Sequence, residues 1–236
     1  MNIAILTAGG VGSRTHQDIP KQFLNVENKP ILIYTLQAFQ AHPNIDEICV
    51  VILEGWDQIL WAYAKQFNIT KLKYVVTGGE TGQDSIFNGL NAIRPNHSDD
   101  DVVIIHDGNR PLVSQDIITD NLVKQRKYGS AVTSIPCTEV VFVSEDGESS
   151  EKSIPRENLQ RTQTPHSYTL GKLWWAHMEA KKRGITGTAA SCSLMEALGE
   201  KTYFSQGSEK NLKITTVEDI DIFKALLNTE RFEWLK

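Results

Sequence analysis

Ile3-Ala4-Ile5-Leu6 leads through Thr7 into Ala8-Gly9-Gly10-Val11-Gly12 at the start of the chain. An unbroken apolar run of this length predicts a strand that is buried on both faces, as in the middle of a parallel sheet. Glycines directly after such a strand let backbone N–H groups approach an anion closely, although they also occur in plain tight turns. The stretch therefore predicts the first strand of an α/β domain, followed by a loop that either holds a phosphate or simply turns the chain.

The same alternation of short apolar runs and longer amphipathic segments continues downstream. Strand-like runs lie at 45–52, 73–76 and 101–106, and segments of helical spacing lie at 30–39, 56–67 and 84–93. We expect Asp84 or an adjacent residue to cap the last of these helices. Buried strands that alternate with helices predict an α/β fold with a doubly wound, mostly parallel, Rossmann-like sheet over about the first 135 residues.

The pattern changes between residues 138 and 164. Alternating residues at 139–143 are followed by a polar turn cluster at 144–150, and Ser153-Ile154-Pro155-Arg156 can return as a second strand. This predicts a two-stranded β-arm that projects from the sheet. Such an arm is only marginally stable by itself, so we expect it to pack on a second copy of the chain, giving a homodimer. Residues 1–236 are then a single domain with an arm inserted at about 138–164.

The remaining C-terminal elements are also visible in the sequence. Leu170 to Arg183 predicts a helix that ends at Gly184, and 194–199 predicts a short helix with a glycine stop. Lys213-Ile214-Thr215 is strand-like, and 217–227 is typical of an amphipathic helix with acidic residues in its first turn.

Composition excludes several classes of function. The formal net charge is −5, so we expect no nucleic-acid partner, since general nucleic-acid binders carry a basic surface. No apolar run approaches the roughly 20 residues of a membrane span, and the N-terminus lacks the features of a signal peptide. Cys49, Cys137 and Cys192 have neither disulfide nor zinc spacing. We therefore expect a cytoplasmic protein with no membrane partner.

Candidate chemistry gathers at a few charged residues. Arg14 and Lys21 lie seven residues apart after the glycine loop, where they could offset negative charge on phosphates or simply lie on a solvated loop. Asp107 ends a predicted buried strand and suits Mg²⁺ carrying a triphosphate, although a turn aspartate is the competing interpretation. Arg110 could hold an anion or pair with a surface acid, and Lys213 alone would be taken for an exposed lysine.

Several separated motifs together resemble a known family. These are Ala-Gly-Gly-x-Gly-x-Arg from Ala8, Pro-Lys-Gln-Phe-Leu at 20–24, Gly78-Gly79 before Asp84-Ser85, His106-Asp107 with Arg110-Pro111, Gln163-Thr164-Pro165, and Asn211-Leu212-Lys213-Ile214-Thr215. In this order they resemble the CTP-dependent polyol-phosphate cytidylyltransferases, which include the ribitol-5-phosphate and the 2-C-methyl-D-erythritol 4-phosphate enzymes. The resemblance extends over nearly the whole chain.

The resemblance implies roles for individual residues. The nucleotide would be held by Leu6, Thr7, Ala8, Gly9, Gly10, Gly12, Gly79, Glu80, Ser85, Asp107 and Gly108. The catalytic cations would be Arg14, Lys21 and Lys213, and Asp107 would bind Mg²⁺. The acceptor would be held by Arg110, Thr138, Glu139, Arg156 and Thr164, with Arg156 and Thr164 reaching over on the arm of a second subunit.

The resemblance also implies a reaction, in which CMP passes from CTP to a polyol phosphate and pyrophosphate is released. Departures from the family pattern lie at Thr138-Glu139, where the isoprenoid enzymes have Asp-Thr, at Gly82, and at Ala189-Ala190. The other motifs favour D-ribitol 5-phosphate, giving CDP-ribitol for teichoic-acid or capsule synthesis. 2-C-methyl-D-erythritol 4-phosphate and glycerol phosphate are alternative acceptors. A nucleotide-binding protein without catalytic activity is the alternative of another class.

Overall fold

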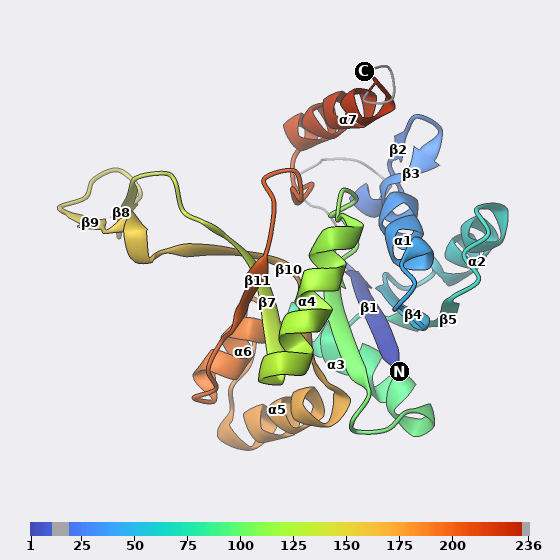
Figure 1. Cartoon of the computed structure of the whole chain (residues 1–236), viewed down its shortest axis with the longest axis horizontal. Coiled ribbons are helices and arrows are strands. Elements are labelled where there is room, and N and C mark those ends of the chain that lie inside the picture. Colours follow the sequence, from blue (N-terminus) through green and yellow to red (C-terminus); the bar gives the residue numbers. More distant parts are fainter. Residues whose placement is uncertain (11–18, 233–236) are drawn as a thin grey trace.

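A seven-stranded sheet forms the centre of the computed structural model, which describes residues 1–10 and 19–232 (Figure 1). Its strand order is β11-β7-β10-β6-β1-β4-β5. The strands are β1 (Asn2–Ala8), β4 (Glu47–Ile52), β5 (Leu72–Thr77), β6 (Val102–Asp107), β7 (Ser130–Pro136), β10 (Gln160–Thr169) and β11 (Phe204–Gln206). Neighbouring strands are parallel, except that β10 runs antiparallel to both β6 and β7. The predicted mostly parallel sheet is confirmed.

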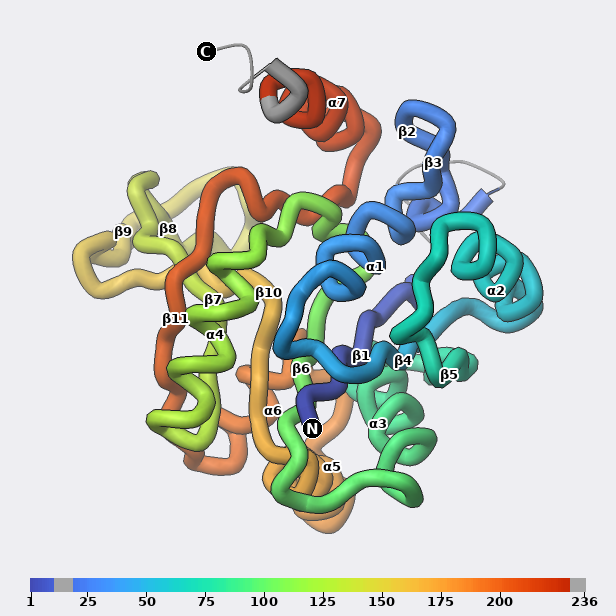
Figure 2. Tube along the Cα trace, turned by 45° about the vertical axis from the view of Figure 1, so that its right-hand side comes forward, coloured from blue at the N-terminus to red at the C-terminus, as the bar shows by residue number. Residues whose placement is uncertain are grey.

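Helices cover both faces of this sheet (Figures 1 and 2). One layer contains α1 (Ile31–Ala41), α2 (Asp57–Gln66) and α4 (Gln115–Tyr128), and the other contains α3 (Gly82–Ile93), α5 (Leu170–Arg183) and α6 (Ser191–Ala197). Alternate residues of β1 serve the two cores, because Ala4 and Leu6 pack on the first layer while Ile3 and Ile5 pack on the second. The sheet is therefore doubly wound, as predicted.

The predicted ends of α1, α2, α3 and α5 agree with the structure to within two residues, whereas the C-terminal helix predicted at 217–227 extends to Phe232. α5 ends at Arg183, and Gly184 adopts a φ of +67°, the left-handed conformation that closes many helices. α3 begins earlier than predicted, because Thr81 is its N-cap and Asp84 completes the capping box from the third helical position. α6 likewise begins at Ser191, three residues before the predicted start.

The predicted arm exists as a hairpin of β8 (Val141–Val143) and β9 (Lys152–Ile154), followed by a short 3₁₀ turn at Arg156–Asn158. It extends away from the rest of the chain (Figure 1). The predicted arm was too long at its C-terminal end, since β10 begins at Gln160 and pairs there with β7 in the main sheet. The arm carries an exposed apolar face, with Val140 and Phe142 exposed by 67% and 58%.

The prediction of a strand at 213–215 was wrong. This segment is an irregular connection between β11 and α7 (Val217–Phe232). Its backbone bonds go elsewhere, because the N–H of Ile214 donates to Asn109 O (2.9 Å) and the N–H of Thr215 donates to the carboxylate of Asp219 (2.7 Å). Beside it, α7 packs on α1 and on the small hairpin of β2 (Asn25–Val26) and β3 (Lys29–Pro30) through a third hydrophobic cluster.

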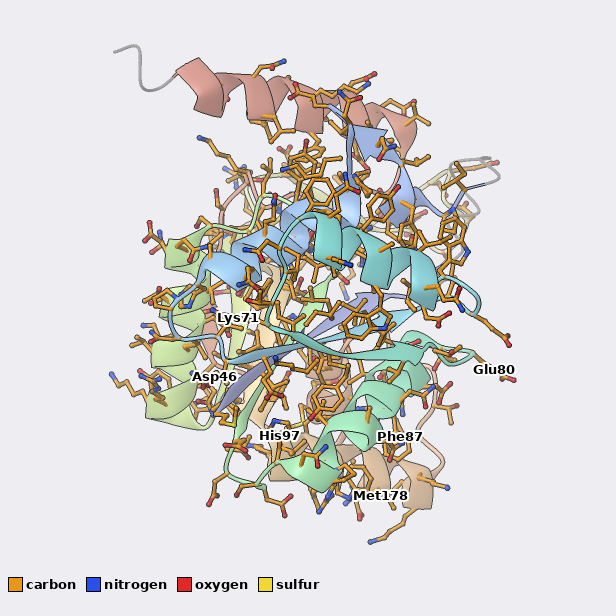
Figure 3. The ribbon with its side chains drawn as sticks, turned by 90° about the vertical axis from the view of Figure 1, so that its right-hand side faces the viewer. Asp46, Lys71, Glu80, Phe87, His97 and Met178 are labelled. Atoms are coloured by element: carbon orange, nitrogen blue, oxygen red, sulfur yellow. The ribbon has the colours of Figure 1, made fainter. Side chains whose placement is uncertain are left out.

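The parallel strands all end on the same side of the molecule. Figure 3 shows Asp46 and Lys71, which lie just before β4 and β5, on one side, and Glu80, which follows β5, on the opposite side. In open α/β sheets ligands bind at the carboxyl ends of the strands. A site is therefore expected on the side of Glu80.

Candidate active site

A cavity of ≈ 570 Å³ lies at the carboxyl ends of β1, β5 and β6. Twelve of the predicted site residues line it: Thr7, Ala8, Gly9, Gly10, Lys21, Gly79, Glu80, Ser85, Asp107, Arg110, Thr164 and Lys213. The positions farthest apart in sequence, Thr7 and Lys213, meet here because β1 lies beside β6 and the segment before α7 bonds to the loop after β6. The fold thus brings together most of the predicted site.

Five of the other predicted residues are described by the structure and do not line the cavity: Leu6, Gly108, Thr138, Glu139 and Arg156. Leu6 is fully buried in the core, and Gly108 lies behind the cavity, where a Cβ would come within 2.9 Å of Leu32 Cδ1. Both positions pack behind the loops that line the cavity. The predicted arm residues Thr138, Glu139 and Arg156 are exposed and do not line this chain's cavity. Gly12 and Arg14 lie outside the described residues.

The glycine-containing loops after β1 and β5 form one part of the cavity wall. The N–H of Gly79 donates to Ser85 Oγ (3.1 Å), which holds the loop after β5 against the first turn of α3. A side chain at Gly79 is excluded, because its Cβ would lie 2.3 Å from Asp84 Cβ and 3.0 Å from Asp84 C. At Gly10, in contrast, no atom of residues 1–10 and 19–232 lies within 4 Å of the position of a Cβ. This open side leaves room for a ligand to approach the backbone.

An ionic cluster forms the opposite wall. Asp107 Oδ1 lies 3.1 Å from Lys213 Nζ, and Asp107 Oδ2 accepts a hydrogen bond from Arg110 Nε (3.0 Å). Burial by itself would raise the pKa of Asp107, but the charges of Lys213 and Arg110 outweigh it and lower the pKa to about 2. Asp107 is therefore a carboxylate at neutral pH, and the cluster carries a net positive charge.

The two cations of this cluster are held by a small set of backbone contacts. Arg110 Nη1 donates to Asn211 O (2.7 Å), two residues before Lys213. Asn109 fixes the other side of Lys213, because its side-chain amide donates to Ile214 O and its carbonyl accepts from Ile214 N. The loop after β6 and the segment before α7 are thus fastened together on both sides of Lys213.

Lys21 reaches the cavity from a short 3₁₀ turn at Lys21–Phe23. The neighbouring Gln22 is buried, and its side-chain amide donates to Ala8 O at the end of β1. Phe23 stacks on Trp56, with ring centroids 4.5 Å apart. These contacts fasten the turn to the sheet and place Lys21 beside the glycine loop.

Thr164 belongs to the main sheet of its own chain, so its predicted position on a partner's arm was wrong. Its hydroxyl accepts a hydrogen bond from Asp107 N (3.0 Å) and lies 3.0 Å from His106 Nδ1. His106 Nε2 in turn lies 3.2 Å from Arg110 O. Burial lowers the pKa of His106 to about 3, so the ring is neutral and links Thr164 to the backbone of Arg110. These contacts connect the backbone of Asp107 with that of Arg110 through Thr164 and His106, and so hold the ionic cluster in position.

Several cavity residues were not predicted from the sequence. They are Gln22, Thr81, Ile86, Ile105, Asn109, Thr162, His166, Ser191 and Ser193. Gln22 lies inside the Pro-Lys-Gln-Phe-Leu motif, and His166 directly follows Gln163-Thr164-Pro165, so motif position was the available signal. Gly82, Ala189 and Ala190, where the sequence departs from the family pattern, also line the cavity. None of these three side chains carries a charge.

Comparison with known proteins identifies the family. The sequence model of 2-C-methyl-D-erythritol 4-phosphate cytidylyltransferase (IspD) matches residues 2–229. The chain belongs to this cytidylyltransferase family. A ribitol-5-phosphate cytidylyltransferase of Lacticaseibacillus paracasei is 43% identical over 96% of this chain and 98% of its own length. A 2-C-methyl-D-erythritol 4-phosphate cytidylyltransferase of Clostridium acetobutylicum is 40% identical over 96% of this chain and 97% of its own length.

Solved structures agree with the family assignment. The 2-C-methyl-D-erythritol 4-phosphate cytidylyltransferase of Francisella tularensis matches with a TM-score of 0.80 and 30% identity, over 95% of this chain and 98% of that one. The 4-diphosphocytidyl-2C-methyl-D-erythritol synthase of Anaerococcus prevotii matches with a TM-score of 0.81 and 26% identity, over 96% of this chain and 98% of that one. The predicted resemblance, the α/β nucleotidyltransferase fold and the enzyme class are therefore confirmed.

The described part of the chain bears on two further expectations. No helix within residues 1–10 and 19–232 has the length and apolar character needed to cross a membrane. The same residues contain no group of three or more His, Cys, Asp and Glu side chains suited to holding a metal ion.

Proposed function

We propose that this enzyme transfers CMP from CTP to a polyol phosphate, forms a CDP-polyol and releases pyrophosphate. The observation that carries the proposal is the cluster of Asp107, Arg110 and Lys213, which faces the glycine loop and Lys21 across one cavity. Such an arrangement suits two polyanions that must be held together, because cations offset their mutual repulsion. The names of the relatives support the same reaction.

The reaction requires no general base, because no proton has to be removed from the attacking phosphate. A phosphate monoester is already an anion near neutral pH, so its oxygen attacks the α-phosphorus of CTP directly while the bond to pyrophosphate breaks. Negative charge accumulates on the oxygens around the α-phosphorus, and Lys21 and Lys213, which line the cavity, would stabilise it. Arg110 would hold the acceptor phosphate. The backbone of Gly9, Gly10 and Gly79 would hold the nucleotide.

The residues present fit a Mg²⁺ ion that is held mainly by its substrate. Mg²⁺ bound with nucleotides takes one or two carboxylates, and phosphate oxygens and water complete its shell. Asp107 supplies one ionised carboxylate in the cavity, with its pKa at about 2. When bound, the ion would neutralise charge on the triphosphate and on the leaving pyrophosphate.

D-ribitol 5-phosphate is the acceptor that we propose, giving CDP-ribitol for teichoic-acid or capsule synthesis. It is supported by relatives named for ribitol 5-phosphate from Lacticaseibacillus paracasei and Vibrio parahaemolyticus, which are 43% and 42% identical. The uncharged wall at Ala189 and Ala190 also departs from the pattern expected of the isoprenoid enzymes. 2-C-methyl-D-erythritol 4-phosphate and glycerol phosphate are the alternatives to test beside it.

The proposal includes a homodimer that forms through the arm, in the cytoplasm. Val140, Phe142 and Val143 expose apolar surface on a hairpin that contacts little of its own chain, as expected for a surface that a second copy covers. On the same arm, Arg156 Nη1 donates to Thr138 O (2.8 Å), so these residues would enter a partner's acceptor site together. All three cysteines are free and buried, in keeping with a reducing compartment.

The dimer can be tested at the arm. Phe142→Asp should convert a dimer to a monomer in sedimentation equilibrium, because it places a charge in the apolar contact. Glu151→Gln changes charge on the same hairpin outside that apolar group and is the matched control. A wild-type chain that is monomeric at micromolar concentration would contradict the proposed dimer.

Pyrophosphate release is the direct test of the reaction. The purified enzyme is mixed with CTP, Mg²⁺ and either ribitol 5-phosphate, 2-C-methyl-D-erythritol 4-phosphate or a glycerol phosphate, with ATP, GTP and UTP as nucleotide controls. Release with CTP and one polyol phosphate would support the proposal and name the acceptor. CTP binding without release from any acceptor would instead support a nucleotide-binding protein without catalytic activity.

A further inference from the structure

β10 departs from regular strand pairing where it passes the ionic cluster. Its register with β7 shifts between Thr162 and His166, so residues 163–165, here called the β10 bulge, do not follow the regular ladder. Bulges of this kind turn residues out of the sheet, and they are common beside active sites. The polar groups of Gln163 and Thr164 are therefore available for bonds to segments outside the sheet.

Gln163 binds the start of the segment that leads to Lys213. Its buried side-chain amide donates from Nε2 to Ser208 O (2.8 Å) and accepts at Oε1 from Ser208 N (3.3 Å). A backbone N–H only donates and a backbone carbonyl only accepts, so these two bonds fix the orientation of the amide. Gly207 packs closely against it, since a Cβ there would lie 2.7 Å from Gln163 Oε1. This end of the segment is thus held against β10.

Asn211 binds the β10 bulge from the other end of the same segment. The residue is fully buried, and its Nδ2 donates to Thr164 O (2.9 Å) and to Gln163 Oε1 (3.2 Å). Because Thr164 O can only accept, the nitrogen of this amide must face the bulge. Asn211 Oδ1 has no hydrogen-bond partner within residues 1–10 and 19–232, so the hold of the side chain rests on Nδ2.

These bonds close a ring around the ionic cluster. Thr164 accepts from Asp107 N at its hydroxyl and from Asn211 Nδ2 at its carbonyl. Arg110 completes the ring, because it donates both to Asn211 O (2.7 Å) and to the carboxylate of Asp107 (3.0 Å). Lys213 lies two residues beyond Asn211 and pairs with the same carboxylate. The placement of both cations therefore depends on the side-chain amide of Asn211.

We propose that Asn211 is a positioning residue, whose Nδ2 bonds to the β10 bulge hold Lys213 and Arg110 where the transfer of CMP requires them. The inference rests on the proposed function, since it gives the two cations of that site their support. Asn211 does not line the cavity, so its effect on the reaction passes through these cations. A small displacement of a group that offsets transition-state charge removes much of its effect.

Asn211→Leu tests the proposal, because it keeps about the volume of the side chain and removes both donated hydrogen bonds. With the acceptor that gives turnover, kcat/KM for that acceptor should fall roughly 10- to 100-fold, since both cations shift. The KM for CTP should change less than about threefold, because the loops after β1 and β5 are untouched. In a Lys213→Met background the same change should cost little further kcat, as expected of a residue that acts through the lysine.

Asn121→Leu is the matched control. Asn121 is an equally buried amide, but its Nδ2 donates to Thr133 Oγ1, Pro165 O and Ser205 Oγ and not to the segment of Lys213. The variant should lower stability like Asn211→Leu and leave kcat/KM within about twofold of the wild type. The comparison separates loss of stability from loss of position.

A second variant applies if Asn211→Leu folds poorly. Gln163→Met removes both bonds to Ser208 and should lower kcat/KM for the acceptor in the same direction, by a smaller factor. Amide hydrogen exchange over residues 207–213 should become faster in this variant. Gln160→Met changes the same residue type on the same strand, where Gln160 Oε1 accepts from Ser134 Oγ, and should alter neither measurement.

Failure of this inference can be told apart from failure of the proposed function. Wild-type kcat/KM in a folded Asn211→Leu enzyme, losses that multiply fully in the double variant with Lys213→Met, or an equal rise in the KM for CTP would each overturn the role of Asn211 alone. Unchanged hydrogen exchange in Gln163→Met, which needs no turnover to measure, would overturn the hold of the bulge on residues 207–213. Absence of wild-type pyrophosphate release with every polyol phosphate would overturn the proposed function and this inference with it.

Discussion

Lys213 shows how one residue can serve both structure and chemistry. It pairs with Asp107 at 3.1 Å, and its side chain is 44% exposed toward the cavity. Lys213→Met should lower kcat on the order of a hundredfold, because a cation near the developing charge is lost. The KM for CTP should change much less, since the charge is needed mainly in the transition state. Steady-state kinetics measure both values.

Lys210→Met is the matched control for this prediction. Lys210 is exposed, lies three residues away and is absent from the cavity wall. A variant at Lys213 that raises the KM for CTP a hundredfold and leaves kcat unchanged would show that this lysine acts in binding alone.

Two glycines of the loops should respond differently to alanine. Gly10→Ala adds a methyl group that meets no atom of the described part of the chain, so the free energy of unfolding should stay within about 0.5 kcal/mol of the wild type. The KM for CTP should nevertheless rise, because the added methyl occupies the approach to the backbone. Gly79→Ala should lower stability by roughly 1–3 kcal/mol through its collision with Asp84. Urea unfolding and CTP kinetics separate the two, and an unchanged KM in Gly10→Ala would exclude close contact there.

At the scale of single residues, the sequence identified the charged residues of the site but missed a buried neutral one. Asp107, Arg110 and Lys213 were found because their motifs are recognisable, and the fold brings all three together. His166 was not found, since a histidine without a metal-binding pattern carries no signal until its burial and its partner are known. For Arg156 the sequence and the structure give no such agreement, because the role proposed for it requires the proposed second subunit.

α7 is the element that connects the end of the chain to the site. Phe223 of α7 is fully buried and meets the ring of Tyr34 edge-on at 5.1 Å. The same cluster includes Ile214, next to Lys213, and Val26, in the hairpin that follows Lys21. One small hydrophobic cluster thus supports both segments that supply lysines to the cavity.

Phe223→Ala should therefore impair catalysis from a distance. A buried Phe→Ala change costs about 3 kcal/mol, which is expected to loosen α7 and the segment of Lys213. We expect a lower kcat and faster amide hydrogen exchange over residues 211–223. Ile222→Ala removes an exposed side chain of the same helix, 52% exposed, and should change neither. Unchanged kcat in a folded Phe223→Ala enzyme would show that α7 does not position Lys213.

Elements were predicted well where local signals agreed. α5 was predicted at its observed bounds, because its helical pattern ends at a glycine suited to the left-handed conformation. The strand predicted at 213–215 failed since its apolar and β-branched residues bond to a loop and to a helix cap instead of to a strand. β10 was assigned partly to the arm because its pairing with β7 is a long-range contact, which local pattern does not reveal.

The whole molecule should lose stability in mild acid. Burial lowers the pKa of His106 to about 3, and lowers those of His166 and His177 to about 4. Between pH 6.5 and pH 4 the unfolded chain binds protons that the folded chain does not, so the free energy of unfolding falls as the pH falls. Each histidine adds up to about 1.4 kcal/mol per pH unit. Urea titrations at pH 7, 6 and 5 measure the slope.

His177→Phe provides the matched variant for this slope. Its ring stacks on Phe87 at 5.5 Å, so Phe keeps a flat ring there and removes one proton site. The three histidines together contribute to the slope of the free energy of unfolding against pH, and this variant should remove about a third of their contribution. The ion-paired Asp107, with its pKa lowered to about 2, adds its own loss only below about pH 4, so the two effects separate. Constant stability between pH 7 and pH 5 would contradict the prediction.

The strand order has a consequence for how such enzymes diversify. The loops after β1 and β5 belong to one half of the sheet, whereas β10, α6 and the arm belong to the other. In the proposed function the first half holds the nucleotide and the second holds the acceptor, so substitutions on the β10 side would change the acceptor while the nucleotide stays the same. Two relatives that are named for different acceptors are 43% and 40% identical to this chain, as expected if the acceptor changes within one conserved fold.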